Sequence, residues 1–360
     1  MAASTQYGWI FHMQNEKEVK LDIRSLSYDE LEDVVSSLNE PSFRTKQIFQ
    51  WLSKDIGSFD DMTNISKSLR AKLSENYYIY RPVVLKKQVS EIDGTIKYLW
   101  ELEDGNAIET VLMSYHYGNT ICISTQVGCR QGCAFCASTI GGLVRNLTPS
   151  EMLSEVIFTQ AESGKTINNI VLMGIGEPLD NFENVIKFLQ LVNDPRGVNI
   201  GMRHITISTC GIVEKFDKLA SYNLQLTLTV SLHGPDDETR SKIMPANQNR
   251  GVDLLLKACS DYYHRTGRRI SFEYAMIDGV NDSEMHAHKL ADCAKKVGAH
   301  VNLITLNYVE ERPFKPTTED NMKLFLRVLD DSGVNYTVRR KLGSDVDASC
   351  GQLRRKQMKS

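Results

Sequence analysis

The stretch T-I-C-I-S-T-Q-V-G-C-R-Q-G-C-A-F-C at residues 120–136 joins a β-strand pattern directly to a cysteine-rich loop. After it, strand and helix patterns alternate along the chain. Further strands are predicted at 169–174, 204–209, 226–232, 270–276 and 301–307, with an edge strand at 334–339. Such alternation indicates an α/β fold with a parallel sheet and crossover helices. Six units favour an open, partial (β/α)6 barrel over a closed barrel of eight.

The sequence on either side of this core predicts smaller structural segments. Ser27 and Glu30 form a capping box, and two amphipathic segments follow it at 44–54 and 65–77. Within the core, Thr148 and Glu151 form a second capping box, with Pro149 at the first turn of the predicted helix. Three β-like runs separated by Asp-Gly turns come next, which predicts a short antiparallel connector. We expect five segments, namely an irregular leader (1–24), a small helical N-terminal domain (25–80), the β-rich connector (81–118), the barrel core (119–345), and a C-terminal loop with a basic tail (346–360).

Composition excludes several classes of protein. Hydrophobic residues make up 41% of the 360 residues and charged residues 24%, which excludes a disordered, collagen-like or coiled-coil chain. The sequence has no long apolar run and no signal-peptide pattern, so we expect a cytoplasmic protein without a membrane partner. Eight cysteines are too few for a disulfide scaffold, and clustered cysteines in a reducing compartment usually bind metal or do chemistry.

The charge distribution leaves an RNA partner open. The net charge of −3 argues by itself against nucleic-acid binding, but residues 339–360 carry seven basic side chains against two acidic ones. A basic tail on an acidic body can contact phosphate, and a solvated tail is the equally weighted alternative. The helical domain is likewise either an RNA contact or a plain cap on the barrel.

The cysteine loop has the spacing C-x3-C-x2-C, formed by Cys129, Cys133 and Cys136. Structural zinc requires four ligands, usually in two C-x2-C pairs, whereas a [4Fe–4S] cluster normally takes one cysteine for each iron. Three cysteines would therefore leave one iron open to another ligand. An iron–sulfur cluster is favoured, with a zinc site or unrelated thiols as the alternatives.

Other polar residues end the predicted strands, where parallel sheets bind their ligands. Gly176 and Glu177 follow the second strand, and Ser208 ends the third. The fourth strand ends in Ser231, Leu232 and His233, and the sixth ends in Asn307. A strand-end hydrogen bond explains any one of them, but together they predict a shared site.

The signature C-x3-C-x-aromatic-C, with Phe135 as the aromatic residue, resembles that of the radical S-adenosylmethionine (SAM) superfamily. The stretches CISTQVGCRQGCAFCAS, RNLTPSE, MGIGEPLDN, ISTCG, SLHGPDDETRSKIMP and DVDASCGQLR are similar to the RlmN/Cfr family of RNA adenine methyltransferases, over roughly residues 25–355. The resemblance implies one [4Fe–4S] cluster on the three loop cysteines, whose open iron chelates SAM. It also implies that the strand-end residues line the SAM site, where reductive cleavage gives a 5′-deoxyadenosyl radical.

The resemblance implies three catalytic residues. Cys350 would take a methyl group from one SAM to form S-methylcysteine, and Cys122 would resolve the product through a transient disulfide. Glu109 would remove the ring proton, and two SAM molecules would be consumed per turnover. From the residues alone, a buried core thiol is the favoured interpretation of Cys122, and Glu109 is equally a surface carboxylate.

The implied substrates are 23S rRNA near the peptidyl-transferase centre and the anticodon-adjacent adenosine of certain tRNAs. An electron donor such as flavodoxin and a monomeric state are expected. Pro178 matches the RlmN branch, which methylates carbon 2, whereas Cfr enzymes tend to carry alanine there and methylate carbon 8. Carbon-8 methylation remains the alternative within the family. A non-enzymatic iron–sulfur RNA-binding protein and a zinc module are the alternatives outside it.

Overall fold

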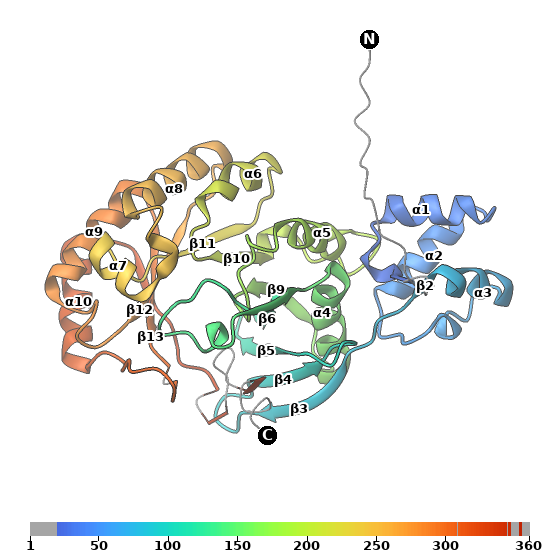
Figure 1. The fold of residues 1–360 in the computed structure, drawn as a ribbon, viewed down its shortest axis with the longest axis horizontal. Helices are drawn as coiled ribbons and strands as arrows, with labels where there is room; N and C mark the ends of the chain where they lie inside the picture. The colour runs from blue at the N-terminus through green and yellow to red at the C-terminus, as the bar shows by residue number, and fades with distance from the viewer. Residues whose placement is uncertain (1–19, 308, 344, 347–352, 355–360) are drawn as a thin grey trace, which may run out of the picture.

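Seven parallel strands form the core of a curved sheet (Figure 1). The structure, a computed structural model, describes residues 20–307, 309–343, 345–346 and 353–354. The parallel strands are β6 (Gly118–Cys122), β9 (Ile167–Leu172), β10 (Ile205–Thr209), β11 (Thr227–Ser231), β12 (Ser271–Met276), β13 (His300–Thr305) and β14 (Tyr336–Val338). Each pairs with the next in that order, and β14 lies at the edge. The predicted partial barrel and its edge strand are confirmed.

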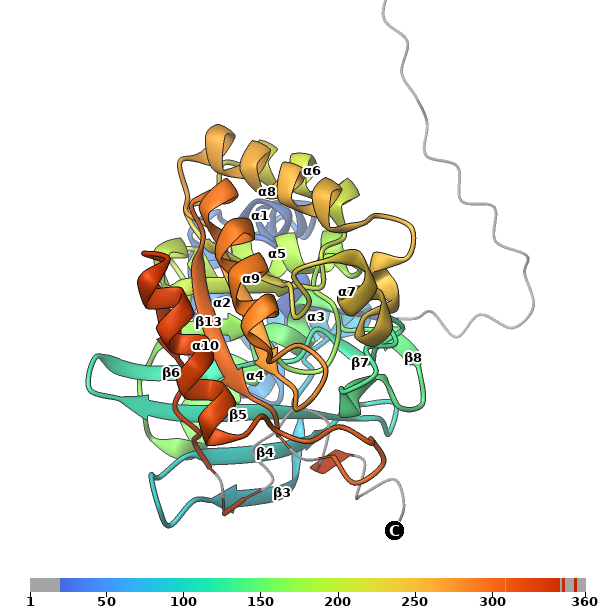
Figure 2. The ribbon, with the colours of Figure 1, turned by 90° about the vertical axis from the view of Figure 1, so that its left-hand side faces the viewer.

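Helices cover one face of this sheet (Figures 1 and 2). They are α4 (Pro149–Ser163), α5 (Phe182–Asn193), α6 (Phe216–Ser221), α7 (Asp237–Ile243), α8 (Val252–Thr266), α9 (Glu284–Val297) and α10 (Glu319–Asp331). Alternation along the strands divides the two faces: Ile205 and Ile207 of β10 are completely buried, whereas Thr206 and Ser208 are only partly buried. The more polar inner face is therefore left to line cavities. Among the described helices, none is long and apolar enough to cross a bilayer.

The three connector strands extend the same sheet. β3 (Val83–Val89), β4 (Ile96–Glu101) and β5 (Ala107–Tyr115) are antiparallel, and β5 pairs with β6, so that ten strands form one sheet in the order β14-β13-β12-β11-β10-β9-β6-β5-β4-β3. In this register Val111 lies opposite Cys122. The connector therefore forms one wall of the barrel.

The first barrel strand is shorter than the sequence pattern predicts. β6 ends at Cys122. The strand β7 (Gln126–Gly128) precedes the cysteine loop and β8 (Leu143–Asn146) follows it, and the two pair in a separate two-stranded sheet. At Gly128 φ is +79°, and a Cβ atom there would lie 2.0 Å from the carbonyl oxygen of Gly142. Only glycine permits this close crossing at the base of the loop.

The helical domain contains α1 (Tyr28–Ser37), α2 (Phe43–Leu52) and α3 (Lys67–Asn76), together with the short pair β1 (Leu21–Asp22) and β2 (Tyr77–Tyr78). The capping box of Ser27 and Glu30 is present as predicted. Residues 21–24, assigned by the sequence analysis to the leader, are ordered into β1 and a 3-10 turn. Arg24 of this turn is buried and donates hydrogen bonds to the carbonyl oxygens of Leu52 at 2.9 Å and Ile56 at 3.2 Å.

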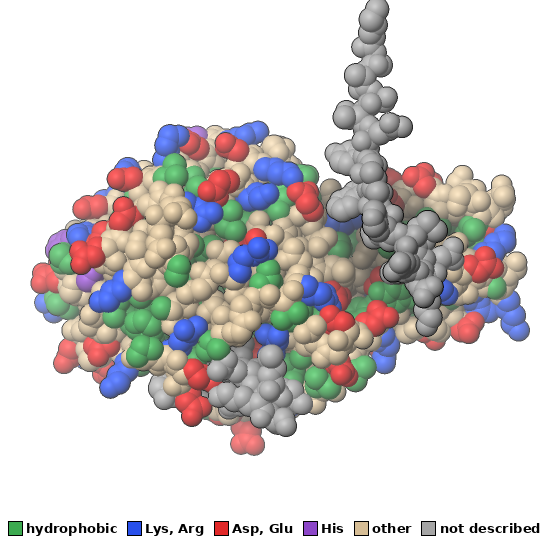
Figure 3. Space-filling model, viewed as in Figure 1, with side chains coloured by type: hydrophobic (Ala, Val, Ile, Leu, Met, Phe, Trp, Pro, Cys, Tyr) green, Lys and Arg blue, Asp and Glu red, His purple; other side chains and the backbone are tan. Residues whose placement is uncertain are grey.

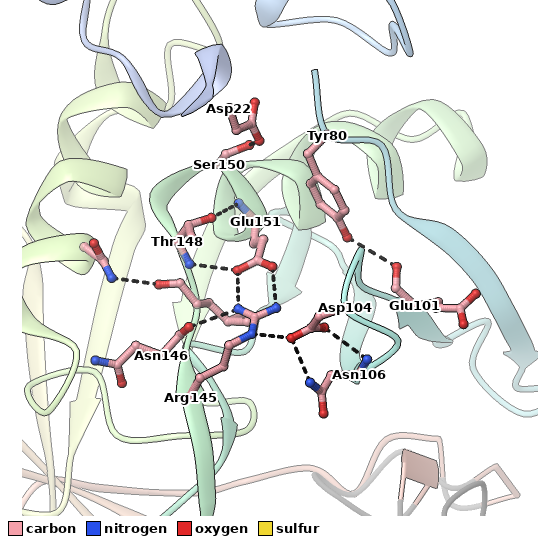
Figure 4. A network of polar contacts seen from close by, with 12 residues as sticks. Asp22, Tyr80, Glu101, Asp104, Asn106, Arg145, Asn146, Thr148, Ser150 and Glu151 are labelled. Carbon is pink, nitrogen blue, oxygen red and sulfur yellow. Dashed lines mark hydrogen bonds and ion pairs between the residues drawn. The ribbon is translucent and has the colours of Figure 1, made fainter. Parts of the chain in front are cut away.

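A polar network joins the helical domain to the barrel (Figure 4). Arg145 of β8 bonds to Asp104 at 2.6 Å and to Glu151 at 2.8 Å, and the Arg145 guanidinium lowers the pKa of Asp104. Glu151 closes the predicted capping box that begins α4. The next residue back, Ser150, donates its hydroxyl hydrogen bond to the carboxylate of Asp22. The start of α4 thus anchors both the β4–β5 turn and the N-terminal domain.

Candidate active site

A cavity of about 290 Å³ opens at the carboxyl ends of the parallel strands. Most of the residues predicted to hold a cluster and SAM line it, namely Cys129, Cys133, Cys136, Gly176, Glu177, Ser208, Ser231, His233 and Asn307. Leu232 does not line it, because its side chain is fully buried in the core. Its backbone nonetheless helps to shape the wall, since its carbonyl oxygen accepts a hydrogen bond from Arg240 at 3.1 Å.

The cysteine loop is held by its own backbone and by a distant arginine. The amide of Cys129 donates to Gly142, and the amide of Cys136 donates to Cys133. Arg312 reaches back to the carbonyl oxygen of Cys136 at 3.1 Å. These contacts keep the three thiols on one side of the cavity.

Two thiols of this loop are held in their protonated form by burial. Burial raises the pKa of Cys129 to about 12 and raises that of Cys133 as well, so each thiol requires a positive partner to ionise. Within the described ranges, no three His, Cys, Asp or Glu side chains are grouped to hold a single metal ion. Three thiols around one cavity, with polar strand ends opposite, provide the donor set that a cluster with one open iron needs.

Glu177 is buried against the cavity wall with both carboxylate oxygens hydrogen-bonded. The amide of Cys210 donates to Oε2 at 2.7 Å, and the amide of Leu179 donates to Oε1 at 3.0 Å. Burial raises the pKa of Glu177. Gly176 beside it has φ +114°, and a Cβ atom there would lie 2.7 Å from Gln126. The absence of a side chain lets the backbone approach β7 while it also lines the cavity.

His233 is a neutral side chain in a fixed orientation. Its Nδ1 atom accepts a hydrogen bond from the amide of Ala275 at 2.9 Å, which leaves the ring hydrogen on Nε2. Burial lowers the pKa of His233 to about 3. The backbone of His233 has φ +53°, and Asn281 donates to its carbonyl oxygen at 2.7 Å. The edge contact between the rings of Phe135 and His233, 5.0 Å apart, ties this wall to the cysteine loop.

Three residues that support the site were not predicted from the sequence. Arg240 is buried and donates hydrogen bonds to the carbonyl oxygens of Cys210 at 2.6 Å and Leu232, which joins the ends of β10 and β11. Asn281 orients His233, and Glu273 lines the cavity wall. Arg240 falls inside the quoted SLHGPDDETRSKIMP stretch, which was the available signal. Cys210 lines the cavity as well.

Cys122 lines a second cavity, of about 180 Å³, next to the first. The two cavities share the residues Met173, Ile304, Asn307 and Arg339. The Cys122 side chain is buried, as the core-thiol alternative expects, but it also faces this space. The structure therefore places a thiol in a cavity that adjoins the one lined by the cysteine loop.

Glu109 lies on β5, two residues before Val111, which pairs with Cys122. Its carboxylate is 3% exposed and bonds to Lys97 at 2.8 Å, so the interpretation as a surface carboxylate is wrong. The amide of Arg354 donates to the other carboxylate oxygen at 2.6 Å. Cys350, four residues earlier in the sequence, lies outside the described residues.

Comparisons with known proteins agree with this arrangement. Residues 123–291 match the Radical SAM superfamily, and residues 21–79 match the family described as "Ribosomal RNA large subunit methyltransferase N-terminal domain". The chain is 51% identical to the "Probable dual-specificity RNA methyltransferase RlmN" of Clostridium novyi (strain NT), over 93% of this chain and 98% of that protein. This chain belongs to the RlmN family of radical SAM methyltransferases.

Two further relatives of this RlmN-family chain extend the match. The protein of the same name from Thermoanaerobacter sp. (strain X514) is 49% identical, over 94% of this chain and 99% of its own. The crystal structure of a radical SAM methyltransferase from Sphaerobacter thermophilus superposes with a TM-score of 0.87 at 39% identity, covering 92% of this chain and 98% of that one. The predicted family and fold class are confirmed. Membership of the superfamily implies a [4Fe–4S] cluster and SAM.

Proposed function

We propose that this RlmN-family chain methylates carbon 2 of an adenosine in 23S rRNA near the peptidyl-transferase centre. We extend the proposal to the anticodon-adjacent adenosine of certain tRNAs, because the relatives are named as dual-specificity RNA methyltransferases. The observation that carries the proposal is the pair of adjoining cavities. One holds the cysteine loop and Glu177, and the other holds Cys122.

Each part of the first cavity has a proposed task. Cys129, Cys133 and Cys136 would hold the [4Fe–4S] cluster, which supplies the electron that cleaves SAM to a 5′-deoxyadenosyl radical. The remaining lining residues would bind SAM: Gly176, Glu177, Ser208, Ser231, His233 and Asn307. Leu232 would act through its backbone, since its side chain packs in the core.

Carbon 2 of adenine is electron-poor and does not attack the methyl group of SAM directly, so the transfer needs a thiol carrier. In the first proposed reaction step, the thiolate of Cys350 would attack the methyl group of one SAM, displace S-adenosylhomocysteine and become S-methylcysteine. A radical derived from a second SAM would abstract hydrogen from that methyl group, and the resulting carbon radical would add to the ring. Loss of the ring proton to a base and return of one electron to the cluster would then leave a thioether between Cys350 and the base. The Cys122 thiolate would then attack the sulfur of Cys350, forming a disulfide and breaking the sulfur–carbon bond. The released methylene carbon would take up a proton to give the methylated base.

Glu109 is proposed to remove the ring proton. Its buried position on the same face of β5 as Val111, which lines the Cys122 cavity, supports this role. Lys97 holds one of its oxygens, and the amide of Arg354 holds the other. The second contact also attaches the C-terminal segment beside the catalytic candidates.

The proposed setting is the cytoplasm, where a monomer would act on RNA that is not yet folded into the ribosome. A reductant such as flavodoxin would supply the electron. The disulfide formed in each cycle would require a reductant too, and thiols are kept reduced in that compartment.

Nucleoside analysis tests the proposal. The cluster is reconstituted anaerobically, and the protein is incubated with methyl-labelled SAM, a reductant and a 23S rRNA fragment. The digest is then compared with 2-methyladenosine and 8-methyladenosine standards. A labelled 2-methyl product is expected, an 8-methyl product would assign Cfr-type chemistry, and no methylated adenosine from a protein with an intact cluster would overturn the proposal.

Two controls separate the remaining alternatives. Cys350→Ala should bind RNA but lose turnover, whereas a non-enzymatic RNA-binding protein would be unaffected. Iron and sulfide in the anaerobically purified protein would exclude a zinc module.

A further inference from the structure

A third cavity, of about 450 Å³, lies beside the turn between β5 and β6. We call it the hairpin groove, and its defining side chains are Tyr115, Tyr117, Arg203, His204, Arg339 and Arg340. Figure 2 shows this turn at the left of the view, whereas β7 and β8, which flank the cysteine loop, lie at the right. The turn is thus on the other side of the barrel from β7 and β8.

Two tyrosine rings in the groove form an exposed stack. The ring centroids of Tyr115 and Tyr117 are 4.9 Å apart with an interplanar angle of 7°. Tyr117 is 60% exposed, and the edge of His116 meets its ring at 5.0 Å. An exposed flat aromatic surface offers a nucleobase a face on which to stack, whatever its identity.

The groove is also cationic. Three arginines and two histidines line it, and no carboxylate does. Among the described residues, neither Arg203 nor Arg340 forms an ion pair, whereas Arg339 lies 3.6 Å from Glu273. By contrast, basic and acidic side chains are interspersed over the described part of the face in Figure 3. In a chain of net charge −3, this local excess of positive charge favours a phosphate-bearing ligand.

The groove is connected to the catalytic interior. Met113, Tyr115, Arg339 and Arg340 line both the groove and the Cys122 cavity. Along β5, Tyr115 is four residues beyond Val111, the partner of Cys122, a separation of about 14 Å at about 3.4 Å per residue. An RNA strand that places a base near Cys122 can therefore extend into the groove.

We propose that the hairpin groove binds a nucleotide that flanks the target adenosine in single-stranded RNA. The base stacks on Tyr117, and Arg203 and Arg340 hold the phosphate. Enzymes that modify a base must take it out of its stack, and contacts to a flanking nucleotide hold the strand while that happens. The inference rests on the proposed function, because it takes the occupant of the Cys122 cavity to be an adenosine.

Fluorescence anisotropy of a labelled RNA fragment containing the target adenosine tests the groove. Tyr117→Ala should raise the Kd by about 5- to 150-fold, as loss of one base–aromatic stack does. Tyr117→Phe should retain affinity, because the ring remains. The matched control is Tyr263→Ala, at an exposed tyrosine of α8 that is outside the three cavities. Arg340→Ala should lower the slope of log K against log salt by about 0.7, the value for one phosphate contact on a single strand.

The outcomes distinguish the groove from the proposed function. Wild-type affinity in Tyr117→Ala together with an unchanged salt slope in Arg340→Ala would overturn the proposal that the groove binds RNA. If the wild-type protein still makes 2-methyladenosine in that case, the proposed function stands alone. A third outcome is that the variants lose RNA affinity while the wild-type protein produces no methylated adenosine. That result would support the groove as an RNA site and overturn the proposed function. A wild-type protein that binds no RNA would overturn both.

Discussion

The Nζ atom of Lys97 lies 2.8 Å from the Oε2 atom of Glu109, at a point where neither side chain is more than 3% exposed. Burial of an isolated charge is costly, so each group depends on the other and on the amide of Arg354. The pair lies across adjacent strands, since Leu99 pairs with Glu109 and Lys97 is two residues earlier on β4. A carboxylate is thereby held in the barrel wall close to the Cys122 cavity.

Breaking this pair should destabilise the fold. Lys97→Met leaves the carboxylate of Glu109 buried without its cation, and we expect the free energy of unfolding to fall by about 3–5 kcal/mol. Urea denaturation under anaerobic conditions measures it. The double variant Lys97→Met/Glu109→Gln should recover much of the loss. Equal losses in the single and double variants would show that the pairing of charge is not the cause.

The cysteine loop should be required for the cluster. Alanine at Cys129, Cys133 or Cys136 removes one ligand, and each variant should lose most of its iron and sulfide after anaerobic reconstitution. Cys259→Ala is the matched control, since Cys259 is buried in α8 away from the cavities. A full iron content in any of the three loop variants would remove that residue from the ligand set.

Removal of Cys122 should trap the reaction. Without the resolving thiol, the methylene carbon stays bonded to both the sulfur of Cys350 and the adenine ring. Cys122→Ala should therefore accumulate an RNA–protein adduct that survives denaturing gel electrophoresis. The double variant Cys122→Ala/Cys350→Ala should form none. Normal release of methylated RNA from Cys122→Ala would contradict the proposed role.

Glu155 should make the free energy of unfolding depend on pH. This side chain is buried, it accepts hydrogen bonds from the hydroxyl of Thr110 and the amide of Ser124, and burial raises its pKa well above the ordinary value. Above about pH 4.3 the unfolded chain releases a proton that the folded chain retains, so stability falls as the pH rises towards the folded pKa.

Glu155→Gln has no such proton to release. Its free energy of unfolding, relative to that of the wild type, should therefore rise between pH 5 and pH 8. Urea denaturation at the two pH values measures the difference. A relative stability that is the same at both would show that Glu155 is already ionised in the fold.

The sequence predicted the features that depend on local order. Periodicity gave the parallel strands, because alternating side chains record which face of a strand is buried. The capping boxes at Ser27 and Thr148 could also be predicted, because each depends on two residues only three positions apart. The strand-end positions of Glu177, Ser208, His233 and Asn307 followed from the rule that the carboxyl ends of parallel strands meet at one edge.

Only the tertiary structure decided the features that depend on distant residues. The pairing of β5 with β6 made the connector a wall of the barrel, and no local pattern specifies which edge a hairpin joins. Glu109 is buried because Lys97 and the amide of Arg354 reach it from other segments. Arg240 and Asn281 support the site through contacts with backbone carbonyl oxygens, which any sequence provides. The hairpin groove combines side chains from β5, β10 and β14, which are brought together only when the sheet curves into a barrel.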